Sequence, residues 1–596
     1  MESERKEFWS ERRRLYKKMT ELFTEIIQSD ESDLTDSEFS SRNLSQFLKL
    51  WANNNVSLEE NLHSEGLGTL KMADFHVEHY IKKILYNLGC PPFDNGRMYD
   101  WWKAKSLKKW RSDKLFGQYQ TEKNVKVMAT LDNTSTKEEI DSLIKNGMDI
   151  ARINCAHGSP GDWLRLIQLI RGFGEDLHRC KIFMDIPGPK IRIEKILFNP
   201  YTVKIQSKNV KKSILGIIKK DSHPFTKNID SLFEIEIKQS SLFEQVNPGD
   251  DIHIKLIDSL HGTLKVVDIL SEQVLLVEAE GPFEINQKCQ LNFSGQELEI
   301  TNIKTTPSSI KVKKGSVIRV YFNEESFRRM RGNRQCACLT VSHPKALKNA
   351  GLNDSVYFDD GIIFGKVTRL TPDFIELLIL SPNEKSKKIK EGKGINFPDS
   401  FVHLLLSTPN QEDLALLPFL IEHADIIGLS YVNHPKDIKK MADILHAYGR
   451  EDIGLVAKIE TKEGIRQLSR IIETGLTYSN FGVMIARGDL AVEAGFQNLL
   501  TAQENILRMC HAAHLPVIWA TGVLNQLTKN GTPTRAEISD VFLASQTECI
   551  MLNKGEFLND SVKMLNLLMH SSIALNSYYR DDGTEFFRAQ KDLLEE

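Results

Sequence analysis

Eight short apolar runs, separated by sequence with a helical period, occur in two blocks of the chain and limit its fold more than any other feature. The block at residues 119–194 holds three runs, namely Val125–Leu131, Asp149–Asn154 and Lys181–Ile186. The block at residues 399–580 holds five, namely Ala424–Val432, Gly454–Glu460, Phe481–Asp489, Pro516–Thr521 and Glu548–Asn553. Strand-like runs that alternate with helical patterns predict an α/β fold with parallel strands.

The two blocks together hold about 260 residues, which is close to the roughly 250 of a (β/α)8 barrel. We therefore predict a TIM barrel that is interrupted after its third strand. A doubly wound open sheet is the alternative architecture for the same alternation.

The interruption, residues 195–398, has a different pattern. Val, Ile and Leu alternate with polar residues, and turn signals such as Asn247–Asp250 recur, which is typical of a β-barrel or sandwich. The order of strand, Asp-rich turn, glycine, strand and apolar strand occurs at 251–277 and again at 354–379. We predict an inserted β-barrel-like domain that is internally duplicated.

Residues 1–118 are polar and helical in period, with Leu44, Phe47, Leu48 and Trp51 recurring at helical spacing. We predict an N-terminal helical extension there and a C-terminal tail at 581–596. The stretch 101–114 interleaves three tryptophans with lysines and arginine. We interpret it as a helix that docks its tryptophans and leaves its lysines in solvent, and contact with nucleic acid or a partner is the alternative.

The charge balance is nearly neutral, since 77 Lys and Arg face 80 Asp and Glu and give a formal charge of −3. Such a balance predicts no binding of the whole chain to nucleic acid or to a membrane. The eight cysteines form no C-x-x-C pair, and no run approaches the roughly 18 apolar residues of a membrane helix. We expect a cytoplasmic protein.

Charged and polar residues follow the predicted barrel strands, and the carboxyl ends of barrel strands are where active sites lie. Glu460 and Asp489 are suited to Mg²⁺ or Mn²⁺, because hard cations prefer carboxylate oxygens. Arginine and lysine would bind phosphate oxygens. Ion pairing at strand ends is the bland alternative for each residue. The set comprises Arg152, Asn154, Asp185, Lys458, Glu460, Arg487, Asp489 and Thr521.

Six blocks of sequence, in order along the chain, resemble the pyruvate kinase family. They are Ala151–Gly158 (ARINCAHG), Asp185–Arg192 (DIPGPKIR), Val456–Gly464 (VAKIETKEG), Met484–Leu490 (MIARGDL), Pro533–Glu537 (PTRAE) and Cys549–Leu552 (CIML). The resemblance covers about residues 120 to 580, and it places the β domain where that family inserts its lid. It implies transfer of a phosphoryl group from phosphoenolpyruvate to ADP, giving pyruvate and ATP in glycolysis.

The resemblance also implies a role for each matching residue. Lys458 stabilises the transferring phosphoryl group, Glu460 and Asp489 ligate the divalent metal, and Thr521 lies near the carbon that is protonated. Other roles follow by position: Arg152 contacts phosphate, Arg192 orients Asp185, the amides of Ala486, Arg487 and Gly488 receive the substrate carboxylate, and Asn154 and His157 line the nucleotide side.

One departure from the family pattern concerns the monovalent cation. Many members bind K⁺ near the positions of Asn154 and Asp185, with a serine, a threonine and a glutamate. This chain has Ala156, Ile186 and Lys190 at those three positions. Because an ammonium group can take the place of a monovalent cation, we predict activity without K⁺. A surface lysine beside a decayed site is the alternative.

Two further departures concern the nucleotide side and the C-terminus. Leu131–Thr134 replaces the family's glycine-proline turn, and Asn553–Glu556 replaces a serine-glycine-glutamate. Only 40 residues follow Glu556, so we expect no C-terminal regulatory domain and do not assume a tetramer, although a homo-oligomer is compatible with the sequence. Residues 41–89 resemble the N-terminal extension of a divergent bacterial and plant group of the family.

Two other classes of function remain open at this point. Related barrels carry out metal-dependent lyase or aldolase chemistry on pyruvate enolate, which needs neither the nucleotide-side residues nor a lid. A non-catalytic regulatory relative is the other alternative, and loss of Lys458, Glu460 or Asp489 would have favoured it.

Overall fold

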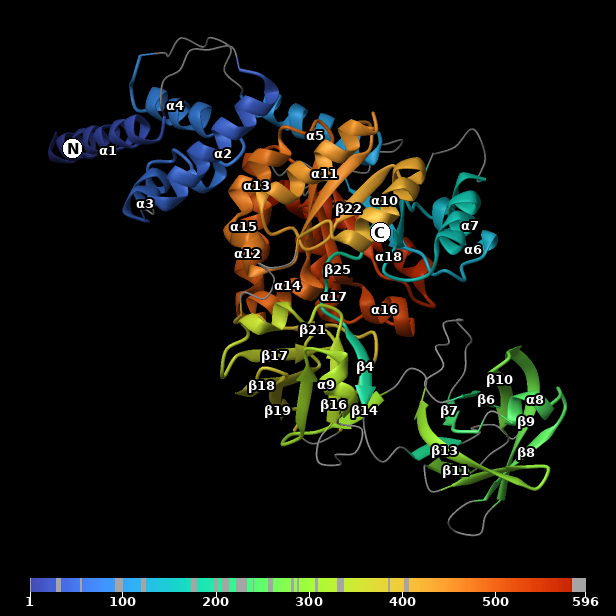
Figure 1. The fold of residues 1–596 in the computed structure, drawn as a ribbon. Coiled ribbons are helices and arrows are strands. Elements are labelled where there is room, and N and C mark those ends of the chain that lie inside the picture. The colour runs from blue at the N-terminus through green and yellow to red at the C-terminus, as the bar shows by residue number, and fades with distance from the viewer. Residues whose placement is uncertain are drawn as a thin grey trace. The chain divides into compact units, whose positions relative to one another are not determined.

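The computed structural model divides the chain into two compact units, residues 1–189 with 406–596 and residues 190–405 (Figure 1). The residues it describes are 2–27, 34–53, 56–91, 100–118, 125–172, 180–197, 202–205, 214–220, 233–239, 241–255, 261–279, 283–286, 289–305, 309–329, 337–383, 386–400 and 407–580.

The first unit contains a closed barrel of eight parallel strands in the order of the sequence, and it confirms the predicted fold class. All eight strands coincide with the predicted apolar runs. Their bounds are β1 (Lys126–Thr130), β2 (Ile150–Asn154), β3 (Lys181–Asp185), β22 (Ile426–Leu429), β23 (Gly454–Ile459), β24 (Phe481–Ala486), β25 (Val517–Val523) and β26 (Cys549–Leu552). β3 pairs directly with β22, which closes the gap of more than two hundred residues between the two blocks.

Helices surround the strands and cover their outer faces, so strands such as β23 and β24 are buried at every residue. Several helices begin with capping boxes, for example Thr136 with Glu139 and Thr534 with Glu537, which satisfy the first free amides. The bounds are α6 (Lys137–Lys145), α7 (Pro160–Arg171), α10 (Gln411–His423), α11 (Pro435–Ala447), α12 (Lys462–Arg466), α13 (Leu468–Gly475), α14 (Arg487–Ala494), α15 (Leu499–Ala512), α16 (Asn525–Asn530), α17 (Arg535–Ala544) and α18 (Leu558–Arg580).

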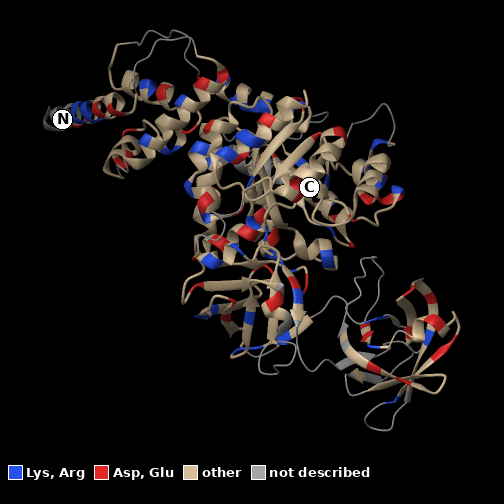
Figure 2. Ribbon diagram, viewed as in Figure 1, with Lys and Arg blue, Asp and Glu red and all other residues tan. Residues whose placement is uncertain are grey.

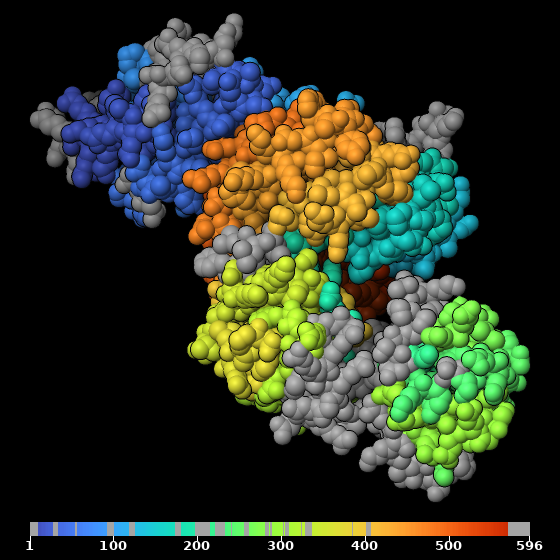
Figure 3. All heavy atoms as spheres, in the orientation of Figure 1, coloured from blue at the N-terminus to red at the C-terminus, as the bar shows by residue number. Residues whose placement is uncertain are grey.

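The N-terminal helices belong to the same unit as the barrel. They are α1 (Glu2–Ile26), α2 (Asp36–Ala52), α3 (Val56–Ser64), α4 (Val77–Asn87) and α5 (Trp101–Phe116), and Figure 3 shows the blue N-terminal surface against the orange surface of the barrel. A buried polar network joins them to the barrel. Arg111 donates to the carbonyl of Ala513 at 2.8 Å and to Ser40, whose hydroxyl lies 2.9 Å from Nδ1 of His514.

The end of α5 closes the bottom of the barrel. Leu115 and Phe116 are buried in one cluster with Met128, Phe183 and other residues of the barrel interior. Lys181, the first residue of β3, donates to the carbonyl of Leu115 at 3.1 Å and so caps the helix. Two glycines in β23 and β24 leave room for this plug, since a Cβ at Gly454 or Gly482 would overlap the methyl groups of Leu115 and force that side chain to shift.

The interpretation of α5 as a helix with docked tryptophans and solvated lysines is wrong for two of the tryptophans and for Lys108, although Lys103, Lys105 and Lys109 are exposed as expected. Trp102 and Trp110 are 70% and 52% exposed, whereas Lys108 is buried. Lys108 forms a 2.6 Å ion pair with Glu548, and the guanidinium of Arg111 is taken up by the network described above. The face of α5 that packs on the barrel is therefore the one whose cations find buried acceptors there, because charged side chains are buried only where partners are available.

The second unit is all β apart from short helices, and the described part contains 18 strands. They are β4 (Ile193–Leu197), β5 (Thr202–Ile205), β6 (Ile214–Lys220), β7 (Phe233–Ile237), β8 (Asp251–Lys255), β9 (His261–Ser271), β10 (Val274–Ala279), β11 (Phe283–Asn286), β12 (Gln290–Phe293), β13 (Gln296–Thr305), β14 (Ser309–Val312), β15 (Val317–Tyr321), β16 (Ala337–Val341), β17 (Ser355–Phe358), β18 (Ile363–Leu370), β19 (Phe374–Ser381), β20 (Lys387–Lys390) and β21 (Ile395–Asn396).

Two seven-stranded sheets make up most of this unit. One is a closed barrel in the order β10-β6-β7-β13-β12-β8-β9, and the other has the order β21-β17-β18-β19-β15-β16-β4. The barrel encloses a hydrophobic cluster of its own, which includes Phe233, Ile252 and Leu275. Residues of both signs of charge are spread along the ribbons of both units (Figure 2).

Candidate active site

Four charged side chains from the ends of β2, β3 and β23 meet at the carboxyl end of the barrel. Asp185 ends β3, and its Oδ1 lies 2.9 Å from Nζ of Lys458 on β23. Arg152 on β2 donates from Nε to Oδ2 of the same carboxylate at 3.1 Å. Lys458 also lies 3.2 Å from Oε1 of Glu460. The structure therefore brings together four residues that the sequence predicted separately.

Burial and pairing act against each other at this cluster. Burial alone would raise the pKa of Asp185, but Lys458 and Arg152 hold that pKa below its ordinary value. Burial alone would lower the pKa of Lys458, but Asp185 and Glu460 raise it. Lys458 is therefore a cation at neutral pH and is held in one position by two carboxylates.

Among these four charged residues, Glu460 is the one whose ionised form is disfavoured by its surroundings. Burial raises its pKa, Lys458 offsets part of that rise, and the negative charges of Asp489 and Asp185 add to it. A divalent cation between Glu460 and Asp489 would remove this repulsion, so the donor set fits Mg²⁺ or Mn²⁺. The described residues contain no group of three or more His, Cys, Asp or Glu placed to hold a metal, so a metal here would take its other ligands from water or substrate.

Tyr431 contacts both carboxylates, and the sequence analysis missed it. Its backbone amide donates to Oε2 of Glu460 at 2.6 Å. Its buried phenol lies beside Asp489, and burial together with the charges of Asp489 and Glu460 raises its pKa well above 10. The residue has a left-handed backbone with φ of 56°, which is uncommon for a residue with a side chain and is found at functional sites.

Ser430 is the second residue that sequence reasoning missed. Lys458 donates to its Oγ at 2.7 Å, and that hydroxyl donates to the carbonyl of Ile186, also at 2.7 Å. Both Ser430 and Tyr431 directly follow β22, the strand whose carboxyl end the search for site residues passed over. Reading that end like the others would have found them.

The guanidinium of Arg487 is hydrogen-bonded within the protein. From its place at a strand end, we had predicted that it would bind phosphate. Its guanidinium forms two bonds to Asp540, at 2.6 and 2.8 Å, and donates to the carbonyl of Thr521 at 2.6 Å. It also stacks over Trp519. At the start of α14 (Arg487–Ala494), the preceding residue Ala486 makes no side-chain cap hydrogen bond.

Thr521 lies beside that backbone. Its φ of 69° places it in the left-handed region, and a Cβ at Gly488 would come within 2.8 Å of its methyl group. Glycine at 488 thus allows the first turn of α14 to approach β25. Thr521 lies toward the carboxyl end of β25, which is the end of the barrel where the four charged residues lie.

Asn154 is the last residue of β2, and His157 lies in the turn that follows it. Oδ1 of Asn154 accepts from the amide of Ala156 at 3.1 Å, and the carbonyl of His157 accepts from the indole of Trp163 at 2.9 Å. The His157 side chain is exposed. The turn is therefore fixed through its backbone.

Lys190 and Arg192 belong to the second unit. Nζ of Lys190 lies 3.4 Å from Oδ1 of Asp360, and Arg192 donates to the carbonyl of Gly392 at 3.2 Å. Their contacts to the strand ends of the first unit stay predictions.

The two departures noted on the nucleotide side contact each other. Asp132 follows β1, Lys554 follows β26, and Nζ of Lys554 lies 2.7 Å from the Asp132 carboxylate. Lys554 lowers the pKa of Asp132, mainly through this hydrogen bond. Because β1 and β26 are neighbours in the barrel, the two replacements form one ion pair at the rim.

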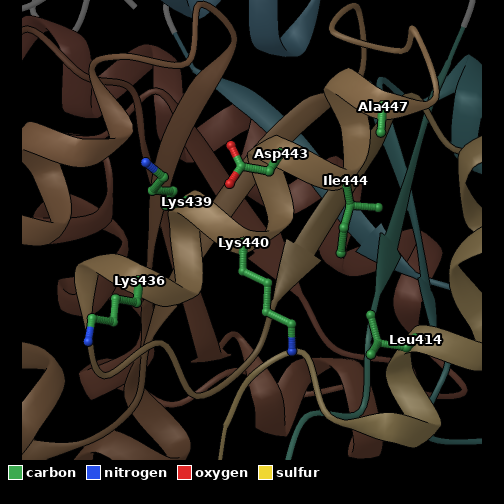
Figure 4. A pocket seen from close by; sticks show the side chains of 7 residues that line it. All are labelled: Leu414, Lys436, Lys439, Lys440, Asp443, Ile444 and Ala447. Carbon is green, nitrogen blue, oxygen red and sulfur yellow. The ribbon is translucent and has the colours of Figure 1, made fainter.

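A surface pocket of about 540 Å³ lies elsewhere, between α10 and α11 (Figure 4). It is lined by Leu414, Lys436, Lys439, Lys440, Asp443, Ile444 and Ala447. None of the residues at the strand ends contributes to it. Across the described part of the chain, no helix is both long and apolar enough for a bilayer.

Comparison with known proteins agrees with the geometry. The family model described as "Pyruvate kinase, barrel domain" matches residues 122–308 and 284–562. Pyruvate kinase of Methanocaldococcus jannaschii is 34% identical over 218 residues, which is 35% of this chain and 46% of the relative. Pyruvate kinase of Clostridium perfringens is 31% identical over 263 residues, 44% of this chain and 52% of the relative.

A longer match is to pyruvate kinase PKLR of Rattus norvegicus, 26% identical over 475 residues, which cover 78% of this chain and 77% of the relative. The chain spans about half the length of the two microbial relatives.

Proposed function

The chain belongs to the pyruvate kinase family, and on that premise we propose that it transfers a phosphoryl group from phosphoenolpyruvate to ADP, giving pyruvate and ATP as a cytoplasmic step of glycolysis. One observation carries the proposal: Lys458 is buried as a cation, 2.9 Å from Asp185 and 3.2 Å from Glu460. A fixed, water-poor positive charge is what a transferring phosphoryl group requires, since catalysis of this transfer is mostly positioning and charge stabilisation.

Glu460 and Asp489 would hold Mg²⁺ or Mn²⁺, which when bound neutralises negative charge on the substrate's carboxylate and phosphate. The residues of the chain do the rest. Lys458 stabilises charge on the phosphoryl group in transit, and Ser430 and Asp185 keep its ammonium in place. Arg152 contacts phosphate from the other side of Asp185.

The substrate carboxylate would lie against the amides of Ala486, Arg487 and Gly488. Phosphoryl loss leaves the enolate of pyruvate, and Thr521 lies where the carbon of that enolate is protonated. In this proposal Arg192 orients Asp185, and Asn154 with His157 contacts the phosphates of ADP.

The test is an assay of the purified chain with Mg²⁺, phosphoenolpyruvate and each nucleoside diphosphate. We expect pyruvate, and we expect Lys458→Met to lower kcat by about 10²–10³ or more. Lys126→Met is the matched control, because Lys126 is another buried strand lysine, paired with Asp149 at the opposite end of the barrel. If no diphosphate yields pyruvate, or if Lys458→Met behaves like wild type, the proposal is wrong.

A further inference from the structure

The pocket between α10 and α11 lies apart from the strand ends, on the helical layer of the barrel (Figure 4). All but one of its lining residues come from α11, where they recur every three or four positions and so share one face of that helix. Leu414 of α10 completes the lining. Its volume of about 540 Å³ is typical of a site that holds a small molecule.

Part of the lining is apolar. Leu414, Ile444 and Ala447 contribute to it, and the aliphatic stems of the lysines on the same helix face extend it. Release of water from such a surface is favourable. The pocket therefore suits a ligand with an apolar body.

The charged part of the lining is mostly positive. Three lysines, Lys436, Lys439 and Lys440, stand beside one carboxylate, that of Asp443. Within the described part of the chain, Nζ of Lys436 and Nζ of Lys439 form no hydrogen bond or ion pair. An anionic group can approach both without breaking a contact inside the protein, and charge-assisted hydrogen bonds to it are strong.

Lys440 differs from the other two lysines because it holds a second segment of the chain. Its side chain extends from α11 toward the residues that precede α10, and Nζ donates to the carbonyl of Pro409 at 2.8 Å (Figure 4). An anion in the pocket would compete with this neutral carbonyl for the same ammonium group. A hydrogen bond between two charged groups is the stronger of the two.

Two further hydrogen bonds lead from this segment to the proposed catalytic lysine. Thr408, which is buried and precedes Pro409, donates from Oγ1 to the carbonyl of Ser430 at 2.9 Å. Ser430 in turn accepts from Nζ of Lys458 at 2.7 Å. All of these residues belong to the first unit, so a continuous series of contacts joins the pocket to Lys458 within one compact body.

The same segment supports the residues after β3. The amide of Gly188 donates to Oδ1 of Asp413 at 3.1 Å, and a Cβ at Gly188 would lie only 2.7 Å from Cβ of Ser430. Close-packed residues move together. A displacement of residues 408–413 therefore reaches Ser430 both directly and through Gly188.

We propose that the pocket between α10 and α11 is a regulatory site for a small organic anion with an apolar body. An anion bound by Lys436 and Lys439 draws Lys440 away from Pro409, the support of Ser430 loosens, and turnover falls because Lys458 is held less firmly. The effect on turnover rests on the proposed function, whereas binding in the pocket does not.

Titration of the purified chain with naphthoate tests the site, because this fluorescent probe joins a carboxylate to an apolar ring system. We expect saturable binding that is weakened about tenfold or more in the double variant Lys436→Met/Lys439→Met, since hydrogen bonds to charged groups are worth more than neutral ones. Lys563→Met, which removes an exposed lysine from α18, should bind the probe as wild type does. No saturable binding, or equal affinity in the double variant, overturns the inference.

Two related probes define the ligand class. Naphthyl phosphate in place of naphthoate shows whether the site prefers phosphate or carboxylate. Naphthyl methanol has the same apolar body without a charge, and it should bind at least about tenfold more weakly than the better of the two anions. Equal binding of the alcohol would show that the lysines attract no anion and would overturn the inference.

Thr408→Val separates binding from its effect on catalysis, because it cuts the link to Ser430 and leaves the lining of the pocket intact. Saturating naphthoate should lower kcat of the wild type at least about fivefold, the lower end of typical allosteric coupling. Thr408→Val should bind naphthoate as wild type does, and its kcat should not change when the probe binds. Lys440→Met should lower kcat without any probe, and Lys440→Arg should restore it. An equal response of kcat in Thr408→Val, or no response in the wild type, overturns the inference.

Amide hydrogen exchange measures the coupling without catalysis. Bound naphthoate should speed exchange in residues 408–413 and 430–434 of the wild type, and only in residues 408–413 of Thr408→Val. If the wild type forms no pyruvate but shows this pattern, the proposed activity fails and the regulatory site stands. Unchanged exchange in residues 430–434 of the wild type overturns the inference, whether or not pyruvate is formed.

Discussion

At the scale of single residues, Tyr431 links the two carboxylates proposed to bind metal. Its amide holds Glu460 and its phenol lies beside Asp489. Groups that orient metal ligands in this way typically contribute about 10–100-fold to affinity. We expect Tyr431→Phe, which keeps the backbone bond and removes the hydroxyl, to weaken Mn²⁺ binding about tenfold in a direct titration.

Tyr478→Phe is the control for Tyr431→Phe. Tyr478 is also a buried tyrosine, and its hydroxyl donates to the carbonyl of Ile453 at 2.7 Å. Its removal should lower the free energy of unfolding by about 1 kcal/mol and leave Mn²⁺ affinity unchanged. Equal Mn²⁺ affinity in the two variants would show that Tyr431 has no part in metal binding.

Asp185 and Asp413 should affect stability with opposite dependence on pH. The pKa of Asp185 is lowered in the folded state, so its contribution is full above the unfolded value near 3.8 and is lost as pH falls through the folded value. Burial raises the pKa of Asp413, so ionisation of that carboxyl becomes unfavourable for folding as pH rises above the same value.

Urea unfolding between pH 3 and 6 measures this difference. The free energy of unfolding lost in Asp185→Asn should reach about 3–5 kcal/mol at pH 6, because the substitution leaves Lys458 and Arg152 without the carboxylate that they share. This loss should shrink toward pH 3. The stability lost in Asp413→Asn should shrink in the other direction, toward pH 6. A loss that is the same at all pH values in Asp185→Asn would contradict the pKa argument.

Lys190 predicts how turnover responds to K⁺. If its ammonium takes the place of the monovalent cation, turnover proceeds without K⁺, and Lys190→Gln is slow but is partly restored by added K⁺. Steady-state rates in Na⁺-only and K⁺ buffers give the answer. A wild-type protein that requires K⁺ would show that Lys190 acts only within its own unit, where it pairs with Asp360.

At the scale of elements, α5 shows how the stabilising contribution of a helix depends on which of its faces is buried against the barrel. Leu115 is fully buried in the barrel bottom, and removing such a side chain costs about 2–5 kcal/mol. We expect Leu115→Ala to lower the free energy of unfolding by that amount. Trp110→Ala, a larger truncation on the exposed face of the same helix, should change it by less than about 0.5 kcal/mol. Circular dichroism during urea titration compares the two.

The sequence was sufficient to predict all eight strands and the interruption after the third, because parallel strands buried on both faces form continuous apolar runs. It was not sufficient to orient α5, since its exposed tryptophans and buried Lys108 depend on acceptors such as Glu548, far away in the chain. Lys458 and Glu460 could be predicted as site residues because they lie at the carboxyl end of a recognisable strand, β23. Tyr431 follows β22 in a left-handed turn, and the sequence has no local signal for that turn beyond its place after the strand.

At the scale of the whole molecule, two compact units predict unfolding in more than one step. The seven-stranded closed barrel of the second unit has a hydrophobic cluster separate from that of the eight-stranded barrel. Calorimetry should show at least two transitions, and Mg²⁺ with phosphoenolpyruvate should raise the midpoint of the barrel transition most, because ligands stabilise the unit that binds them. Glu460→Gln should abolish that shift and leave the other transition where it was.

The plug at the bottom of the barrel also sets an order of events during synthesis. Leu115 emerges from the ribosome before any strand, yet Gly454 and Gly482, which shape its seat, are made more than three hundred residues later. At roughly 5–20 residues per second, the apolar end of α5 is made about 20–70 seconds before these two glycines. The end of α5 thus cannot be fully packed until the β insertion has been translated, because several residues of its cluster, such as Ile426 and Val456, belong to the second block of the barrel.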